Sequence, residues 1–284
     1  MKTEVFSLIF SILILSGCNK MKVDKTVDLE EIIKSEIAFA KLSETTGRKT
    51  AFLSNLLDSA TVLVPMPAKS IDVYSTVEDL PGQLLWHPEY AEISDDGNIG
   101  FTTGPWIFTV NSDEPKKYYG HYLSIWQRIP ERGWKIIFDA GIGYQSEVDL
   151  NIETKKFPEI MAPETESTRE LSQAISSFND MVLLEGEKGA YNSYLNEYCR
   201  VYREGIAPEI SRQVQLNQLI DSPFEYKYTN YTSGVSESED FGYEFGSLEV
   251  NDIHSSLITN YSFCRIWKLV GSEWKILIDL RLRI

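Results

Sequence analysis

The sequence predicts an α+β protein in which one module occurs twice, each copy with helices followed by a curved antiparallel sheet. In both halves, apolar residues first recur at helical spacing and later alternate with polar residues over strand-length segments. The two halves also repeat each other. The tryptophan-containing segments 124–127 and 133–139 match 265–268 and 273–279 at a separation of 140 or 141 residues.

The first domain is expected over residues 28–146. Its N-terminal helix carries an apolar stripe from Leu29 to Ala40, with Asp28 as the N-cap and Gly47 as the residue that ends it. Turn residues such as those at 95–97 separate the later strands. The remaining elements are two short helices over 49–57 and 71–80, and five strands over 60–64, 84–93, 99–110, 117–129 and 134–142.

The second domain is expected over residues 167–284, after a polar, proline-containing linker at 147–166. Its separation from the first domain drifts from 139 to 142 residues along the chain, which indicates small loop insertions in a true repeat. We expect each domain to unfold cooperatively as a separate fragment. The upstream matches are Phe39 with Phe178, Gly47 with Gly186, Ala51 with Ala190, Phe52 with Tyr191, and 100–104 with 242–246.

Composition and charge exclude several classes of protein. The chain has 284 residues, of which 43% are hydrophobic and 24% charged, so it is globular and not disordered. A net charge of −15 argues against a nucleic-acid binder. Because there are only three His and three Cys, and no phosphate-binding loop, nucleophile elbow or zinc-protease motif, neither a metal nor a cofactor is predicted.

The first seventeen residues have the pattern of a signal peptide. An apolar run over 5–15 is too short to cross a hydrocarbon core of ~30 Å, and it leads into the sequence Leu-Ser-Gly-Cys at 15–18. That sequence resembles the bacterial lipobox, which implies cleavage before Cys18 and a lipid on its thiol. We therefore expect a polar tether over 18–27 and a lipid-anchored protein of the cell envelope, facing the periplasm or the cell exterior. The alternative is an ordinary secretory signal with an incidental cysteine.

An extracytoplasmic location makes a disulfide between Cys199 and Cys264 chemically feasible. Such a bridge requires Cα atoms within ~7 Å of each other, which sequence does not determine. The alternative, two separate buried thiols, is the one we favour.

Four segments of the first module carry a family resemblance: Trp86-x-Pro88, the run 97–106, Gly120-x-Tyr122-x-x-Ile125-Trp126, and Trp134-Lys135-x-x-x-Asp139. They resemble the SnoaL-like, uncharacterised branch of the nuclear transport factor 2-like superfamily over nearly all of residues 28–144. The second module resembles it more weakly, with Tyr228 in place of Trp86. The resemblance implies a cone-shaped bent sheet around three helices, often enclosing a pocket. Since that superfamily includes isomerases, dehydratases, hydrolases, ligand binders and dimerisation modules, the fold does not determine the function.

Catalytic side chains are scarce. A ketosteroid-isomerase-like mechanism needs a carboxylate base before the proline that ends the first strand, but Val64 precedes Pro65 and Arg203 holds the equivalent place in the second module. His87 and His121 are the only histidines of the first module and the remaining candidates for a general base. The alternative, which we favour, is that both are ordinary strand residues.

Aromatic residues predict either a filled core or an apolar ligand pocket in the first domain. Trp106 and Phe108 share one face of a strand, and Tyr118, Tyr122 and Trp126 share one face of the next. Two glycines on the Trp106 face leave the strand bare, which makes room for a ligand. The candidate pocket residues are Trp86, Phe101, Trp106, Tyr122 and Trp126.

Strict alternation along the last strand of each module places Asp139 and Asp279 on an outward face, beside lysine or arginine. A solvated or ion-paired carboxylate keeps an ordinary or lowered pKa, so Asp139→Asn is expected to cost under ~1 kcal/mol. A β-bulge between residues 134 and 139 would reverse this orientation.

Three functions follow as hypotheses. The first is a lipid-anchored, non-catalytic protein that binds a small apolar or amphipathic ligand or a protein partner. The second is an isomerase, dehydratase or hydrolase that acts in the first-domain pocket. The third is a structural or dimerisation module, whose sheets pair within the chain or in a homodimer. A pocket with a histidine and a carboxylate favours the second hypothesis, and a sealed aromatic core favours the third.

Overall fold

The computed structural model describes residues 25–76, 81–156, 170–219 and 224–284. The predicted signal peptide and Cys18, most of the tether, and the second part of the linker lie outside these residues. Within the described ranges, none of the helices combines the length and the apolar character that crossing a membrane demands.

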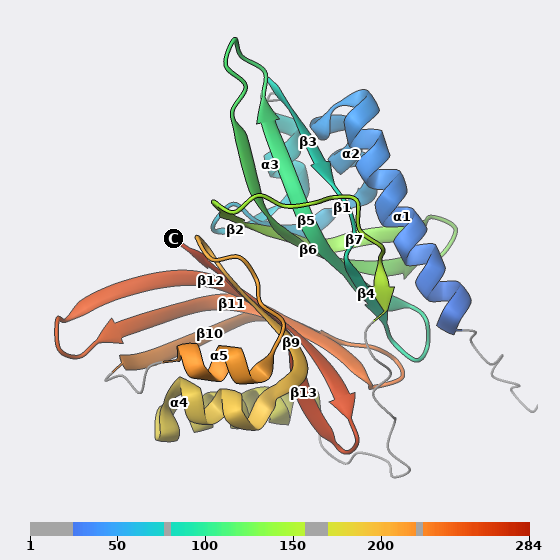
Figure 1. Cartoon of the computed structure of the whole chain (residues 1–284). Helices are drawn as coiled ribbons and strands as arrows, with labels where there is room; N and C mark the ends of the chain where they lie inside the picture. Colours follow the sequence, from blue (N-terminus) through green and yellow to red (C-terminus); the bar gives the residue numbers. More distant parts are fainter. Residues whose placement is uncertain (1–24, 77–80, 157–169, 220–223) are drawn as a thin grey trace, which may run out of the picture.

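The first half of the chain, residues 25–156, contains three helices and a mixed, mainly antiparallel sheet of eight strands (Figure 1). The sheet has the order β2-β1-β7-β6-β5-β4-β8, and β3 also pairs with β5. The helices are α1 (Lys25–Thr46), α2 (Arg48–Asn55) and α3 (Ser70–Thr76). The strands are β1 (Leu56–Leu63), β2 (Pro67–Lys69), β3 (Gly82–Trp86), β4 (Tyr90–Ile93), β5 (Ile99–Val110), β6 (Lys117–Ile129), β7 (Gly133–Tyr144) and β8 (Lys155–Lys156).

The second half, residues 170–284, contains two helices and a five-stranded sheet of order β10-β11-β12-β13-β9. Helix α4 is interrupted at Gly186, whose φ of 74° is left-handed, just as Gly47 with φ of 90° separates α1 from α2. The elements are α4 (Leu171–Tyr194), β9 (Leu195–Arg203), α5 (Arg212–Gln218), β10 (Phe224–Val235), β11 (Phe241–Asp252), β12 (Leu257–Val270) and β13 (Glu273–Arg283).

Two local expectations differ from the structure. The predicted strand over 84–93 is divided into β3 and β4 at residues 87–89, where Pro88 has no N–H to donate and three residues stand opposite two of β5. Helix α1 begins at Lys25, so Asp28 lies inside its first turn and is not the N-cap; its carboxylate pairs with Arg128 of β6 instead. The first part of the predicted linker contains β8, which pairs with β4.

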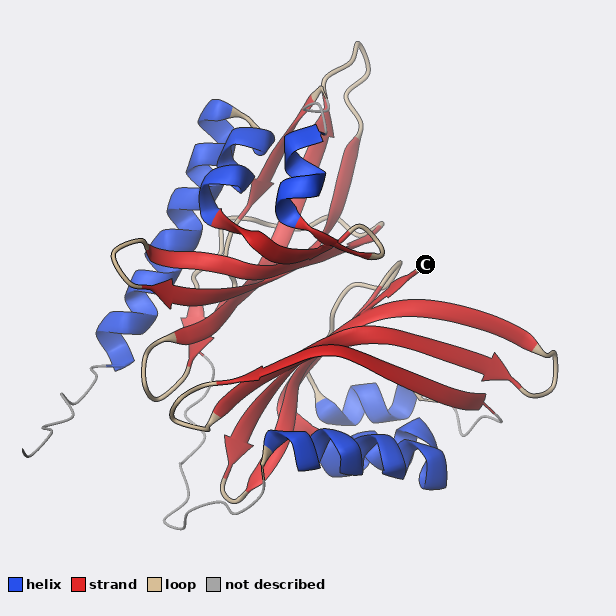
Figure 2. Cartoon of the chain, turned by 180° about the vertical axis from the view of Figure 1, so that it is seen from behind, coloured by secondary structure: helices blue, strands red, loops and turns tan. Residues whose placement is uncertain are grey.

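The two sheets pack face to face, and the helices of each half cover the outer face of their own sheet (Figure 2). The layers are therefore helix, sheet, sheet and helix. Between the sheets lies one apolar cluster to which both halves contribute, and its aromatic contacts cross from one half to the other: Phe101 lies 6.3 Å from Phe241, and Phe138 lies 5.2 Å from Phe245, between ring centroids. The halves thus share a core as well as having cores of their own.

Polar contacts also join the halves. Lys268 of β12 is buried, and its Nζ lies 2.7 Å from Asp240 and 3.3 Å from Glu92 of the first half. The same Nζ donates to the carbonyl of Ile93, at 3.2 Å. The turn between β4 and β5 contributes as well, since the backbone N–H of Asp95 donates to Asp240. Burying the Lys268 ammonium without partners would be costly, so these contacts favour the one arrangement of the sheets in which its partners from both halves are in place.

A β-bulge reverses the predicted orientation of Asp139. The register between β6 and β7 shifts, because Ile125 pairs with Phe138 whereas Trp126 pairs with Ile136. Ile136 therefore packs in the helix-side core, while Phe138 packs between the sheets. Asp139 consequently faces the helices. The predicted outward orientation was wrong, because alternation holds only along an unbroken strand.

The second half has the same bulge, between Ile266 and Trp267 of β12. Asp279 is fully buried as a result and is not outward-facing. The two cysteines are free: Cys199 packs in the helix-side core, and Cys264 packs in the core between the sheets. They lie on opposite faces of one sheet, so the structure has two separate buried thiols.

Because the halves share a core, we expect Phe138→Ala to lower the free energy of unfolding by about 3–5 kcal/mol, the usual cost of deleting a buried phenyl ring. Denaturant unfolding followed by far-UV circular dichroism measures this cost. Hydrogen exchange should show protection lost in strands of both halves together. Leu183→Ala, at an exposed helical position, is the control and should change stability by less than about 0.5 kcal/mol. Loss of protection in the first half alone would contradict the shared core.

Candidate functional site

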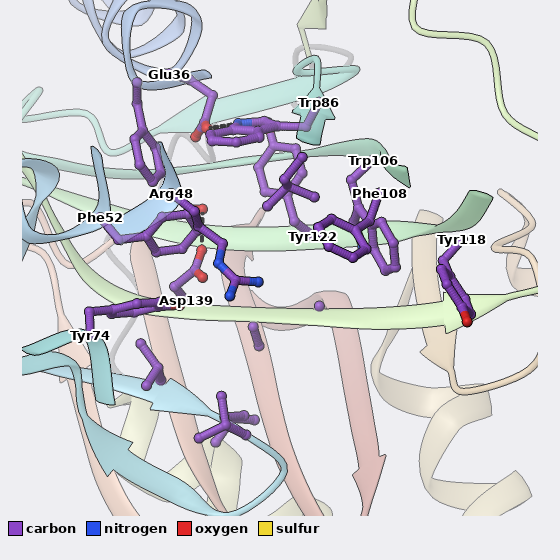
Figure 3. A pocket seen from close by; sticks show the side chains of 18 residues that line it. Glu36, Arg48, Phe52, Tyr74, Trp86, Trp106, Phe108, Tyr118, Tyr122 and Asp139 are labelled. Atoms are coloured by element: carbon purple, nitrogen blue, oxygen red, sulfur yellow. Dashed lines mark hydrogen bonds between the residues drawn. The ribbon is translucent and has the colours of Figure 1, made fainter. Parts of the chain in front are cut away.

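The first half contains a cavity of about 410 Å³, open to solvent on one side, between its helices and the concave, helix-facing side of its sheet (Figure 3). This volume lies in the range of small-molecule sites. Its wall is mostly apolar and aromatic, with a few polar side chains. The lining residues are Glu36, Phe39, Arg48, Phe52, Val62, Leu63, Val64, Tyr74, Leu84, Trp86, Trp106, Phe108, Tyr118, Tyr122, Ser124, Asp139, Ala140 and Gly141.

Strands β3, β5 and β6 supply the aromatic wall. Because side chains alternate along a strand, Trp106 and Phe108 lie on one face of β5, and Tyr118 and Tyr122 lie on the same side of β6. Gly120 stands between these two tyrosines, and a Cβ there would lie 2.3 Å from the Trp106 ring. The glycine therefore allows the indole to lie flat across β6 and form one side of the cavity.

Glu36 of α1 forms the inner end of the cavity and is fully buried. Its carboxylate accepts hydrogen bonds from Trp86 Nε1 at 2.6 Å and Trp126 Nε1 at 3.0 Å, and from the hydroxyl of Thr102. Burial raises the pKa of Glu36, and the three donated hydrogen bonds oppose that rise. This carboxyl holds two indole rings in place and has few lone pairs left for a ligand.

Asp139 of β7 lies on the wall with its carboxyl toward the cavity (Figure 3). Ser124 of β6 donates a hydrogen bond to it at 2.7 Å. Burial raises the pKa of Asp139 to about 7; the Ser124 hydrogen bond opposes the rise, and the charge of Glu36 adds to it. Near neutral pH this carboxyl can both give and take a proton, and as a neutral acid it can donate a hydrogen bond.

Arg48 and Tyr74 complete the polar part of the wall. Arg48 is the first residue of α2, directly after the left-handed Gly47, and its side chain points into the cavity (Figure 3). Burial and the charge of Asp139 raise the pKa of the Tyr74 hydroxyl, and Arg48 opposes that rise, so both charges lie near this hydroxyl.

In the second half, buried arginine side chains occupy the positions equivalent to two residues of the cavity wall. Arg265 and Arg281 stand where the first half has Ser124 and Gly141, at the repeat separations of 141 and 140 residues. Arg265 is fully buried, with its Nε 2.7 Å from Asp279 and its guanidinium over three aromatic rings. Large paired side chains thus replace the small residues that leave the first cavity open.

A second set of contacts completes this filling. Arg281 pairs with Glu187 of α4 and donates to the hydroxyls of Tyr191 at 2.6 Å and Tyr228 at 2.7 Å. Arg203 lies 2.7 Å from Asp279. Burial disfavours the charge of Asp279, but Arg203, Arg281 and Arg265 together hold its pKa well below the usual range. Asp139 and Asp279 therefore occupy equivalent positions with opposite pKa shifts.

Neither histidine candidate lines the cavity. His121 lies on the face of β6 that packs against the second sheet, where its imidazole contacts the hydroxyl of Tyr144 and, at 3.4 Å, Glu89. His87 is half-buried in the turn between β3 and β4. Val64, at the place of the isomerase base, does line the rim and is 52% exposed. A histidine-based reaction in this cavity has no support from the geometry.

The structure divides the predicted pocket residues. Trp86, Trp106 and Tyr122 line the cavity. Trp126 lies behind the wall in the helix-side core, and Phe101 faces the second sheet, so these two are not lining residues. Sequence analysis missed the polar members of the site: Glu36, Arg48, Tyr74, Ser124 and Asp139. The alignment of the two halves could have indicated the cavity, because the small residues Ser124 and Gly141 of the first half align with arginines in the second.

The sequence matches no family model and no curated protein. Solved structures resemble part of the chain. One is a nuclear transport factor 2-like superfamily protein from Salmonella enterica serovar Typhimurium, with 13% identity over 44% of this chain and 96% of its own, and a TM-score of 0.35. Another is an epoxide hydrolase from M. tuberculosis, with 9% identity, coverage of 39% and 76%, and a TM-score of 0.32. A third is the association domain of C. elegans CaMKII, with 9% identity, coverage of 41% and 96%, and a TM-score of 0.33.

The raised pKa of Asp139 makes stability depend on pH. Because the folded-state pKa is raised from 3.8 to about 7, the stabilisation linked to the protonated form is complete below about pH 4 and is lost as the pH rises through 7. Asp139→Asn keeps the shape without the charge. We expect the stability of this variant relative to the parent to rise between pH 4 and pH 8, by about 4 kcal/mol in denaturant unfolding.

Asp279→Asn is the matched control at the equivalent position. Its lowered pKa means that the ionised form stabilises the fold, so the variant should lose about 3–5 kcal/mol at pH 8 by leaving buried arginines uncompensated. A pH-independent effect of Asp139→Asn would show that the carboxyl is well solvated.

Proposed function

We propose that this protein binds a small, largely apolar ligand in the cavity of its first half, without catalysing a reaction. The observation that carries the proposal is the contrast between the halves. An aromatic-lined space of about 410 Å³ is open in the first half, whereas buried ion pairs occupy the equivalent place in the second. Apolar walls supply affinity through burial, and the few polar groups orient the ligand.

We further propose that the two halves are tandem copies of one nuclear transport factor 2-like unit, the first close to the SnoaL-like branch. Equivalent features support a duplication. Gly47 and Gly186 both have left-handed φ at a helix break. The parallel pairing of Val62 with Asp139 recurs as Val201 with Asp279. On this view the second copy filled this part of its concave face with ion pairs and has a structural role by packing its sheet against the first.

The site belongs, in this proposal, to a lipoprotein of the cell envelope. The lipobox-like sequence ending at Cys18 and the apolar run before it support a lipid anchor. The sheet faces that such a unit would offer to a second copy are paired within the chain, so a homodimer through this face is not needed.

Gly141→Leu tests the cavity. Its side chain would extend into the space that Arg281 fills in the second half, so we expect it to abolish binding of a neutral apolar dye such as Nile red, measured by dye fluorescence. A Cβ at this position lies 3.3 Å from the His121 carbonyl, which a small shift relieves. Leu183→Ala, at an exposed position of α4 outside the lining, is the control and should retain the parent affinity. Equal binding by all three proteins would refute the proposal.

One observation favours an enzyme as the second candidate. Asp139 lines the cavity with a pKa of about 7, the value suited to a general acid or base at neutral pH. If it abstracts a proton from carbon, a bound ligand incubated in D₂O should gain deuterium, measured by mass spectrometry. Asp139→Asn should then stop the exchange while ligand binding persists. If the parent protein shows no exchange, the enzyme hypothesis is wrong and ligand binding remains as the proposed function.

A further inference from the structure

The charge on the cavity wall identifies the polar end of the ligand, given the proposed binding function. Of the described residues that line the cavity, Arg48 alone carries a positive charge. Its guanidinium makes no hydrogen bond or ion pair with another residue in the described part of the chain. A guanidinium that faces a mostly apolar space and has no carboxylate bonded to it favours an anionic ligand group.

In the second half, the charged residue equivalent to Arg48 has a partner of opposite charge. The residue equivalent to Arg48, at the repeat separation of 139, is Glu187, which pairs across the core with Arg281. In the first half the position equivalent to Arg281 is Gly141, which has no side chain. The wall opposite Arg48 thus lacks the counter-charge that the second half provides, and open space takes its place.

The other ionisable groups of the wall limit the charge that a ligand can carry. Glu36 and Asp139 are both carboxyls with raised pKa values, and a dianionic group beside them would be repelled as they ionise. A single carboxylate suits the site better, because it can accept two hydrogen bonds from one guanidinium and a third from neutral Asp139 or Tyr74.

We propose that the ligand is a monocarboxylic acid with an apolar body, whose carboxylate pairs with Arg48 while its hydrocarbon part lies against Trp86, Trp106 and Phe108. The acid enters with its carboxylate toward the first turn of α2 and its apolar part along the aromatic wall of β3 and β5. Selection between an acid and its alcohol analogue then depends on one side chain.

Calorimetric titration of the full-length chain with decanoate, 1-decanol and decyl phosphate, each below its micellar concentration, tests this assignment. We expect decanoate to bind about tenfold or more tightly than decanol, the effect typical of a charge-assisted pair. Arg48→Gln should remove that preference and leave decanol affinity within about twofold. Lys49→Gln is the matched control: it removes the same charge one residue later, where the ammonium is bound to the carbonyl of Ser75 and does not line the cavity.

The outcomes are distinguishable. Preference for decanoate that is lost only in Arg48→Gln supports the proposal. Equal affinity for decanoate and decanol, or a decanoate preference that survives in Arg48→Gln, overturns the carboxylate assignment and leaves the apolar cavity intact as a binding site. Tighter binding of decyl phosphate than of decanoate overturns it in favour of a dianionic head group. Failure of all three compounds and of the neutral dye to bind refutes the binding function itself.

Discussion

The packing of the two sheets against each other is the constraint on which the rest of the structure depends. Each sheet has helices on one face and the other sheet on its second face, so its central strands are buried on both sides. In strands buried on both sides, the sequence does not alternate between apolar residues on a core face and polar residues on a solvent face. Lys268 is buried in this contact, and it is paired with a carboxylate from each half, Glu92 and Asp240. Because a buried charge without partners is costly, these pairs favour one alignment of the two sheets.

The β-bulges allow residues of one long strand to pack in two different cores, one on each face of the sheet. In β7 the bulge lets Ile136 pack under the helices and Phe138 pack between the sheets, although the two residues have the same parity. The same shift turns Asp139 toward the cavity. Without the shift, the Asp139 carboxyl would face the second sheet. In the cavity wall, burial raises its pKa to about 7. One inserted residue thus moves this carboxyl from the contact between the sheets to the candidate site.

The two halves differ in what occupies the concave, helix-facing side of the sheet. The second half fills it with arginines paired to Asp279, Glu187 and Glu244, with aromatic rings around these ion pairs. The first half places Ser124 and Gly141 at two of these positions and keeps a cavity. Close packing leaves little empty volume in most protein interiors, and the open apolar space beside Arg48 is therefore the basis on which we propose a ligand.

The sequence by itself predicted a mixed α+β fold, the order of most helices and strands, and which aromatic residues share a strand face, because these follow from local periodicity and turn chemistry. It also indicated Trp86, Trp106 and Tyr122 as cavity residues. The tertiary structure alone decided the direction of Asp139, since a bulge changes the parity of a strand without a distinctive local pattern. Phe101 needed no bulge: β5 keeps an unbroken register with β6, so alternation along the strand already places Phe101 on the face opposite Trp106. The tertiary structure alone decided that Glu36 and Arg48, from helices remote in sequence from β7, meet Asp139 around one space. Charge and desolvation depend on neighbours brought together by folding, and periodicity carries no information about them.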